Sequence, residues 1–518
     1  MKIININFIC LVIVVWLLSG CTLKGGWLTT VGSDYRKPIL PTPSRWNAAM
    51  PVVQTPVAHG GKVLSLKNWW AGFNDIALNR LLDAAQKESA SVANAKARIE
   101  QARTDLIGTD SQFLPSLDAN LAASRSNFSF GGTPFKRSQY QIGFQSSWEI
   151  DLFGGLARQQ EASHSHLESS NASWHDARVA VAAEVADAYL AFRYCEIQVQ
   201  LAQSDASSRE ASAELLAIAG NAGFRSPAEV ALANASAAEG NKILIQRQGQ
   251  CERSIKGLVA ITAINEPELR RLLAVAPTQV ATLPSPPSFQ IDAIPATILQ
   301  QRPDVAAAER DMAEASAKIG VEQANRFPKV SLSGNITPVL QNINGAALTL
   351  AETWSIGPTI SLPLFDAGKR AAKVDAAKAQ YEAALSQYRA TARTAIKEVE
   401  EALVRLHSVE LRLPHAVAAV TGYTTSFESY QKLFEVGLGN LIDVETARRN
   451  KVAADLSLKE LEQERVSAWI ALYRAAGGSW QDDDTVNPKV RATTTQPLEK
   501  RSHESTDLST HRNNESQG

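Results

Sequence analysis

The chain has 518 residues, which is enough for several domains. Its 52 lysine and arginine residues nearly balance its 53 aspartate and glutamate residues, so the charge gives no indication of a nucleic-acid ligand. Beyond the N-terminus, no stretch reaches the roughly 18 consecutive apolar residues that a membrane-spanning helix needs.

The N-terminus has the pattern of a bacterial export signal. A short positive region precedes the mostly apolar run Ile6–Leu18, which is too short to span a membrane but suits a signal peptide. The run ends in Leu18-Ser19-Gly20-Cys21, which resembles a lipobox. We predict a lipoprotein signal peptide over 1–20 and lipidation of Cys21; the alternative is an ordinary signal peptide with an incidental cysteine. By resemblance to bacterial sorting rules, Thr22 rather than aspartate after the cysteine indicates the outer membrane.

The rest of the chain contains one unit twice, over 74–262 and 295–476. Corresponding positions stay about 213 residues apart, a domain-length repeat rather than a short solenoid repeat. These positions are Pro115 and Pro328, Phe153 and Phe365, Gly223 and Gly437, and Val230 and Val444. We therefore predict an internal tandem repeat.

Each copy is predicted to contain two strands. The clearest is Tyr140–Leu152, where apolar residues alternate with polar ones, and 354–364 repeats the alternation in the second copy. Strands of about 9–11 residues with one apolar and one polar face suit a transmembrane barrel. A soluble sheet with one face on a core is the alternative for any single strand. The segments Arg125–Gln139 and Pro338–Thr353 are predicted to be external loops, because they are rich in Ser, Gly and Asn.

A very long helix is predicted after each strand pair. The first, Gly154–Ala222, would be roughly 100 Å long at 1.5 Å per residue. The second covers about Ala367–Val436, with a bend expected near Pro414. Shorter helices are predicted to stack beside them: Ser91–Gln112, Ala228–Thr262, Asp304–Arg326 and Ile442–Ala475.

Three remaining segments connect or extend the two copies. The N-terminal segment 21–73 and the Pro-rich linker 263–294 are predicted to form an equatorial belt around the helices. The polar tail 477–518 is placed in the same belt, and from Gln481 onward it is polar and charged and is predicted to lack structure.

These elements predict an α+β fold with four strands per chain. Four strands cannot close a transmembrane barrel, since about eight is the minimum and an open edge in lipid leaves backbone groups unpaired. The chain must therefore form an oligomer. A dimer would supply eight strands and a trimer twelve, and the pattern alone does not choose between them.

Several short motifs together resemble the outer membrane efflux protein family, and in particular its nodulation-type lipoprotein branch. They are Trp69-Trp-Ala-Gly-Phe-Asn-Asp75, Trp148-Glu-Ile-Asp-Leu-Phe-Gly154, Gln301-Arg-Pro-Asp304, Leu362-Pro-Leu-Phe-Asp-Ala-Gly368 and Ala475-Ala-Gly-Gly-Ser-Trp480. Val31-Gly-Ser-Asp-Tyr35 looks like the N-terminal signature of that branch. The resemblance implies a homotrimer with a 12-stranded transmembrane β-barrel continued by a periplasmic α-helical barrel. It also implies a periplasmic adaptor and an inner-membrane pump as partners.

The same resemblance implies where the channel would narrow. The second long helix ends in a turn at Gly437, and the family's pore-constricting positions match Ile442, Asp443 and Arg449. In a trimer, each such residue forms a ring of three that can select ions by charge. The alternative for Asp443 is a carboxylate favoured by the start of its helix. Gly223 and Gly437 are predicted to be left-handed caps in the turns and to mark the adaptor-docking tip.

Two cysteines lie in the body of the chain. Cys195 is about 29 residues before the first turn and Cys251 about 27 after it. An antiparallel hairpin therefore brings them within roughly 3 Å of each other along the helix axis. Because the periplasm is oxidising, we predict a disulfide. Two buried free thiols are the alternative.

No catalytic motif, cofactor motif or metal-ligand set is recognisable in the sequence. The leading functional hypothesis is a passive outer-membrane duct that exports small molecules such as drugs or toxic compounds. The alternatives are a duct for a type I-like protein secretion system and a non-conducting structural envelope lipoprotein.

Overall fold

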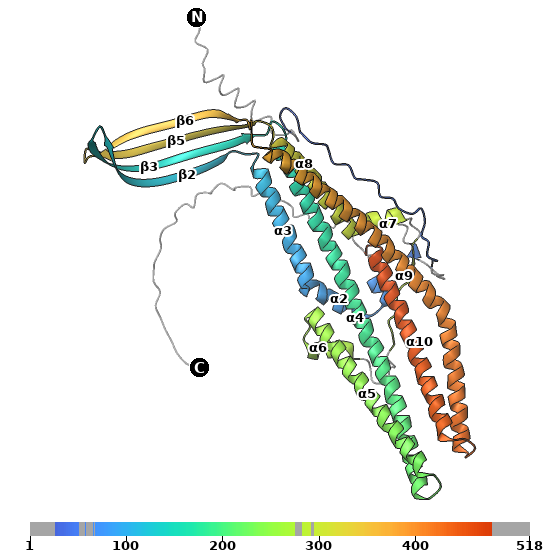
Figure 1. The fold of residues 1–518 in the computed structure, drawn as a ribbon. Helices are drawn as coiled ribbons and strands as arrows, with labels where there is room; N and C mark the ends of the chain where they lie inside the picture. The colour runs from blue at the N-terminus through green and yellow to red at the C-terminus, as the bar shows by residue number, and fades with distance from the viewer. Residues whose placement is uncertain are drawn as a thin grey trace, which may run out of the picture. The chain divides into compact units, whose positions relative to one another are not determined.

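The computed structural model describes residues 26–50, 57–58, 66, 68–274, 282–291 and 295–478. Within them, the order helix, strand, strand, long helix, helix occurs twice (Figure 1). The first set is α3 (Ala90–Ser111), β2 (Ser116–Phe130), β3 (Thr133–Ile150), α4 (Gly155–Asn221) and α5 (Pro227–Thr262). The second is α8 (Pro303–Ala324), β5 (Lys329–Ile343), β6 (Thr349–Ser361), α9 (Lys369–Glu435) and α10 (Leu441–Ala475). Shorter elements are α2 (Ile76–Glu88), α6 (Glu266–Leu273), α7 (Pro295–Gln301), the 3-10 helix η2 (Trp70–Phe73), β1 (Val57–Ala58) and β4 (Phe289–Gln290).

The four long strands form one antiparallel sheet in the order β2-β3-β5-β6. They have 15, 18, 15 and 13 residues, longer than predicted. The predicted loops Arg125–Gln139 and Pro338–Thr353 are wrong, because both hairpins continue pairing through most of these residues. Polar composition misled the prediction, since backbone hydrogen bonds hold a ladder together whatever its side chains are. The first turn is only the glycine pair 131–132, both with positive φ.

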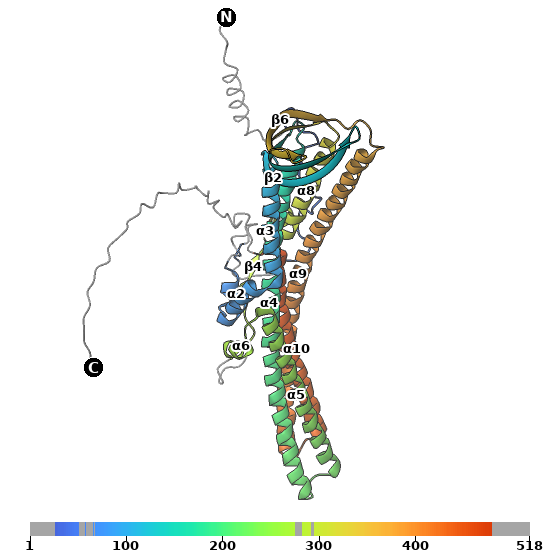
Figure 2. The same cartoon turned by 90° about the vertical axis from the view of Figure 1, so that its left-hand side faces the viewer.

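Apolar residues line one face of this sheet and remain exposed. Paired positions share a face, so the register places the apolar side chains of β3 and β5 together, for example Phe144 opposite Ile336. Exposed members of the face include Leu117, Leu121, Tyr140, Ile142, Phe144, Ile336, Leu340, Trp354, Ile356 and Ile360. Figure 2 shows that the sheet is curved. A broad exposed apolar face indicates that something other than water covers it.

The long helices α4 and α9 each have 67 residues. α3 and α5 pack along α4, while α8 packs against both long helices and α10 packs along α9 (Figure 1). Glycines in the left-handed conformation, Gly154 and Gly368, precede the two long helices. α9 continues through Pro414 and is drawn as a curved helix in Figure 2.

The main hydrophobic core lies where the short helices meet the middle of the long ones. Trp69 stacks on Tyr473 with ring centroids 4.6 Å apart, and its indole N–H donates to the Pro287 carbonyl at 2.8 Å. Nearby, β1 pairs in parallel with β4. The N-terminal segment and the linker therefore meet at this level of the chain.

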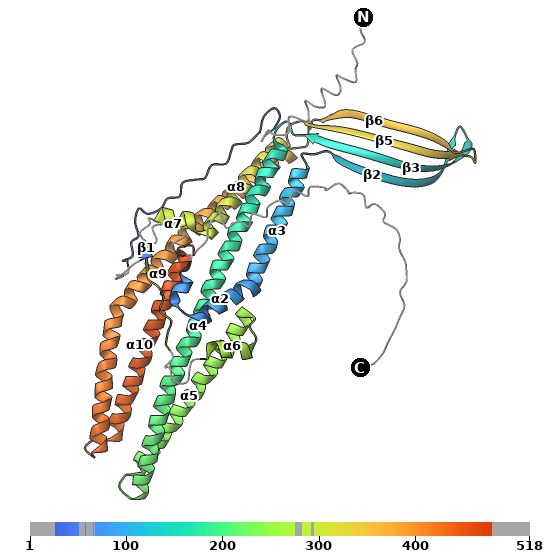
Figure 3. The ribbon, with the colours of Figure 1, turned by 180° about the vertical axis from the view of Figure 1, so that it is seen from behind.

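The belt predicted for 21–73 needs a correction. Residues from Gly26 to about Leu40 run lengthwise beside α8 rather than around the helices (Figure 3). Farther along, the N–H groups of Asn47 and Ala48 donate to the Glu400 carboxylate of α9, both at 2.8 Å. The N-terminal segment therefore hydrogen-bonds to α4, then to α8 and then to α9 along its length.

The signal peptide 1–20, the lipidation residue Cys21 and the tail from residue 479 onward lie outside the described residues. Among the helices that the structure describes, none is both long enough and apolar enough to cross a bilayer.

Cys195 of α4 and Cys251 of α5 are joined as a disulfide, with Cα atoms 5.5 Å apart. Antiparallel helices bring residues that are equally far from their turn to the same level along the helix axis, which places these two cysteines together. The bond closes a loop that contains the first hairpin tip.

We expect both thiols to be blocked in the purified protein. Denatured protein treated with an alkylating reagent should carry no label on Cys195 or Cys251 until a reductant is added, as measured by peptide mass mapping. Replacing both with serine should lower the free energy of unfolding by about 2–4 kcal/mol. Alkylation of both residues without reductant would contradict the disulfide.

Candidate functional site at the hairpin tips

The two helical hairpins end in turns at the same end of the helices (Figure 1). Gly223 and Gly437 have φ values of 80° and 81° there, a conformation that glycine adopts without strain. The N–H of Phe224 donates to Ala219 O at 2.8 Å, and that of Leu438 to Leu433 O at 2.9 Å. These are the hydrogen bonds of a helix end closed by a left-handed glycine.

Capping side chains start the returning helices. At the first turn, Ser226 and Glu229 form a reciprocal capping box. The pKa of Glu229 is lowered, first because its carboxylate accepts hydrogen bonds from the Ser226 backbone and hydroxyl. At the second turn, the Asn440 side chain accepts from the Asp443 N–H at 2.9 Å and donates to the Asp443 carboxylate at 2.6 Å. Asp443 is therefore engaged at its helix start, the alternative weighed for it above.

Of the predicted gate residues, Ile442 and Arg449 lie on one exposed stripe of α10 together with Thr446. The side chain of Arg449 donates to the Thr446 hydroxyl at 3.4 Å. The opposite face of α10 carries Leu441, Val444, Glu445, Ala447 and Arg448, all buried. The structure thus separates the predicted residues from a second set that the sequence analysis missed.

That second set is a buried network, which we call the tip network: Asp205, Arg209 and Ser212 of α4, Ser236 of α5, and Glu445 and Arg448 of α10. All four charged members are buried. Arg448 pairs with Glu445 through Nη1 and donates through Nη2 to Ser212 Oγ at 3.2 Å.

Ser236 connects the two charge pairs of the tip network. Its hydroxyl donates to Glu445 Oε2 at 2.8 Å and accepts from Arg209 Nη1 at 3.0 Å. Arg209 in turn pairs with Asp205, with Nε and Oδ2 2.8 Å apart. Two arginines balance two carboxylates, so the buried charges compensate one another and join the first hairpin to the second.

Neighbouring residues make room for the tip network. A Cβ on Gly240 of α5 would lie 2.9 Å from Arg209 Cδ and 3.3 Å from Ala206 Cα, so glycine permits the close approach of α4 and α5. The Arg448 guanidinium lies over the Phe427 ring of α9 at 5.6 Å. Closer to the turns, Arg225 lies over Phe434 of α9 at 4.9 Å. Contacts between the hairpins therefore involve all four helices.

A sequence signal for the tip network exists but is incomplete. Glu445 and Arg448 share a helix face with apolar Leu441 and Val444, and Asp205 is four residues before Arg209. Charges on an apolar stripe suggest buried pairs. Which helix faces them is decided only by the packing of distant segments.

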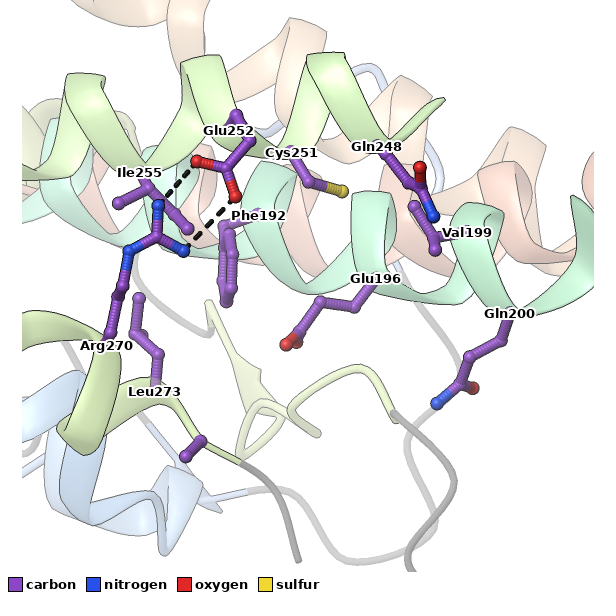
Figure 4. A pocket seen from close by; sticks show the side chains of 11 residues that line it. Phe192, Glu196, Val199, Gln200, Gln248, Cys251, Glu252, Ile255, Arg270 and Leu273 are labelled. Atoms are coloured by element: carbon purple, nitrogen blue, oxygen red, sulfur yellow. Dashed lines mark hydrogen bonds and ion pairs between the residues drawn. The ribbon is translucent and has the colours of Figure 1, made fainter. Parts of the chain in front are cut away.

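A cavity of about 400 Å³ lies between α4, α5 and α6, beside Cys251 (Figure 4). Arg270 closes one side through two hydrogen bonds to Glu252, at 3.2 and 2.5 Å. Burial raises the pKa of Glu196 on the α4 wall, and Arg193 at 2.7 Å opposes that shift. Within the described residues, no group of three or more His, Cys, Asp or Glu side chains is placed to hold a metal ion.

A model of the outer membrane efflux proteins matches residues 81–263 and again residues 294–478. The chain belongs to the outer membrane efflux protein family. The resemblance read from the sequence motifs is therefore confirmed.

Relatives and solved structures agree with this membership. The chain is 26% identical to the solvent efflux pump outer membrane protein SrpC of Pseudomonas putida, over 90% of this chain and 96% of the relative. It is 26% identical to nodulation protein T of Rhizobium leguminosarum bv. viciae, over 92% and 94%. The solved outer-membrane channel OprN matches with a TM-score of 0.73 and 27% identity, covering 87% of this chain and 99% of that one. This efflux family protein is thus placed in the outer membrane.

We expect the tip network of this efflux protein to hold its hairpins together. Glu445→Gln leaves Arg448 and Arg209 with too little negative charge, which should weaken local stability by up to about 3–5 kcal/mol. Hydrogen exchange should then accelerate in the first turns of α10. Adding Arg448→Met to that variant should recover part of the loss, because the uncompensated charge is removed.

An ion pair farther along α10 provides a control. It joins Glu464 of α10 to Arg412 of α9, 2.7 Å apart, with about a third and a half of the respective side-chain surfaces exposed. Glu464→Gln should leave the exchange rates of α10 nearly unchanged, since exposed pairs contribute about 0–1 kcal/mol. Equal acceleration in both variants would show that the buried network has no special role.

Proposed function

We propose that the chain is the outer-membrane exit duct of a tripartite efflux system. It passively conducts small molecules, such as drugs or toxic compounds, from an inner-membrane pump across the periplasm and the outer membrane. The observation that carries this proposal is a sheet with one exposed apolar face that leads directly into two 67-residue helices. Membership of the efflux family and the likeness to OprN support it.

The functional form proposed is a homotrimer. In the described sheet, β2 and β6 are edge strands, each paired on one side only. Edge strands in hydrocarbon leave backbone N–H and C=O groups without partners, so another copy must cover them. Three copies supply twelve strands for a barrel, with the long helices continuing as a periplasmic tunnel.

The two halves are proposed to be copies of one unit, and this predicts how chains join. Ser116 opposite Ser147 in the first hairpin corresponds to Lys329 opposite Ser361 in the second. Between the hairpins, Ile150 pairs with Val330. By the same correspondences, Ile150 matches Leu364 and Val330 matches Leu117. The contact between chains would therefore place Leu364 of one chain opposite Leu117 of the next. Both leucines are open in the isolated chain, 87% and 73% exposed.

This register keeps the apolar faces of neighbouring chains on one side of the sheet. A shift by one residue would turn every apolar side chain of the joining strand to the other face. A shift by two would preserve the faces, so an experiment must separate the two registers.

Cysteine pairs test the trimer and its register together. The contact between Gln145 and Asn335 within the chain predicts Thr359 opposite Ala122 of a neighbour. Directly paired residues in antiparallel strands have Cα atoms about 4.5–5.5 Å apart, which a disulfide can bridge. Thr359→Cys combined with Ala122→Cys should therefore yield cross-linked dimers and trimers on non-reducing gels.

Gly357→Cys with Ala122→Cys is the matched control, on the same face but displaced by two residues, at about 7–8 Å. Faster cross-linking of the control pair would overturn the register and leave the trimer standing. The proposed assembly would be rejected if native mass spectrometry found only monomers and neither cysteine pair formed a cross-link.

The gate is proposed to lie at the hairpin tips. Opening the tunnel there requires α10 and its exposed stripe, with Ile442, Asp443 and Arg449, to move relative to α4. The tip network ties α10 to α4 and to α5, and it is proposed to favour the closed arrangement. Rings of Asp443 in the trimer would attract cations at the narrowest point.

Conductance tests this gate. In planar bilayers, Glu445→Gln should raise the open probability of the channel at least about tenfold, because each 1.4 kcal/mol taken from the closed state is a factor of ten. Glu464→Gln should not raise it. A folded trimer of the parent protein that never conducts would instead favour a structural lipoprotein.

The proposed location and partners follow from the same assembly. Cys21 is proposed to carry the lipid anchor. The turns at Gly223 and Gly437 are proposed to dock a periplasmic adaptor, and they present Phe224 and Leu438, 83% and 78% exposed. A deletion strain should become more sensitive to small toxic compounds and keep its secreted proteins; loss of a secreted protein alone would indicate protein secretion instead.

A further inference from the structure

The segment Gly26–Tyr35, which we call the strap, is fixed to the end of the sheet by backbone hydrogen bonds. The N–H of Trp27 donates to Asp151 O at 2.8 Å, that of Leu28 to Leu152 O at 3.0 Å, and that of Val31 to Phe153 O at 3.0 Å. The strap therefore begins at the same level as the end of β3.

Side chains hold the strap along its length. Buried Arg158 of α4 donates to the carbonyls of Val31 and Gly32 at 3.2 and 3.0 Å, and to the Asp34 carboxylate at 2.9 Å. The Tyr35 hydroxyl hydrogen-bonds to the buried Glu309 of α8. Because strands, α4 and α8 all contact it, the strap has a set height relative to the sheet.

The strap extends the apolar face of the sheet. The Trp27 ring meets the Trp148 ring edge-on, with centroids 6.3 Å apart, and Trp148 belongs to the apolar face of β3. Leu28 is 71% exposed and Trp27 46% exposed, although both are large and apolar. Their exposure is continuous with the face that the outer membrane must cover.

Aromatic residues mark both limits of that face on β3. Tyr140 and Trp148 are eight residues apart, or about 26 Å along a strand, which is about 20 Å of height at the roughly 40° tilt of barrel strands. Outer-membrane barrels have an apolar band about 25 Å tall between two girdles of aromatic residues, so the two rings fall near its two edges. Trp27 and Trp148 would thus stand at the limit nearer the helices.

We propose that Trp27 and Leu28 bind the phospholipid surface of the inner leaflet of the outer membrane, as a second anchor beside Cys21. Tryptophan is enriched at membrane–water interfaces, where its amphipathic ring lies at the level of the lipid headgroups. Farther along the strap, Ser33 and Asp34 are exposed and polar. The membrane boundary therefore crosses the strap between Leu28 and Ser33. This inference rests on the barrel proposed above.

A spin label tests the boundary in the assembled full-length protein. Leu28→Cys and Ser33→Cys are labelled with a nitroxide and reconstituted into phosphatidylethanolamine–phosphatidylglycerol vesicles, with the parent chain treated identically as the blank. The label at 28 should collide severalfold more with lipid-soluble oxygen than with a water-soluble nickel chelate. The label at 33 should show the reverse preference.

Three outcomes separate the possibilities. If the trimers conduct but the nickel chelate collides equally often with the labels at 28 and 33, the proposed lipid contact is wrong. The proposed duct function is then unaffected. If the label at 28 is shielded from both reagents, a protein surface covers it and the lipid contact is again wrong. Should Leu28→Cys fail to assemble, the exposed neighbour Thr29→Cys serves as the probe with the same expected result.

Discussion

Two unpaired strand edges govern the rest of this structure. β2 and β6 each offer a row of backbone donors and acceptors, and a membrane contains no water to satisfy them. A soluble protein could cover such edges with charged residues or short strands. Here the strands are long and one face is apolar, and further copies of the chain are the partners proposed to close the ladder.

The same constraint explains why the two halves differ in detail while sharing their order of elements. Within one chain, β3 and β5 join the two halves by backbone hydrogen bonds, and in the proposed trimer β6 and β2 pair with neighbouring chains in the same way. Only the first half has an N-terminal strap beside its strand end, with Arg158 holding it. Leu364, at the corresponding place in the second half, is exposed, as the proposed contact with a neighbouring chain requires.

At the other end of the helices, charge rather than backbone pairing controls the arrangement. Hydrophobic contacts alone tolerate sliding, but a buried carboxylate cannot leave its arginine without a large cost. Ser236 joins the pairs Asp205–Arg209 and Glu445–Arg448, so the hairpins are held in one relative position. The tip network can therefore act as a two-state switch, because its buried ion pairs are either formed or broken.

The sequence by itself determined the order of elements, the length of the helices and the height of the cysteine pair. Those features depend on local periodicity and on residue spacing, which are visible along a single chain. The predicted strand ends were wrong, because a hairpin segment rich in Ser, Gly and Asn has the same composition as a loop. Only the tertiary structure decided the path of the strap and the partners of Glu445 and Arg448. Both depend on which distant helix faces a given side chain, and no local pattern encodes that.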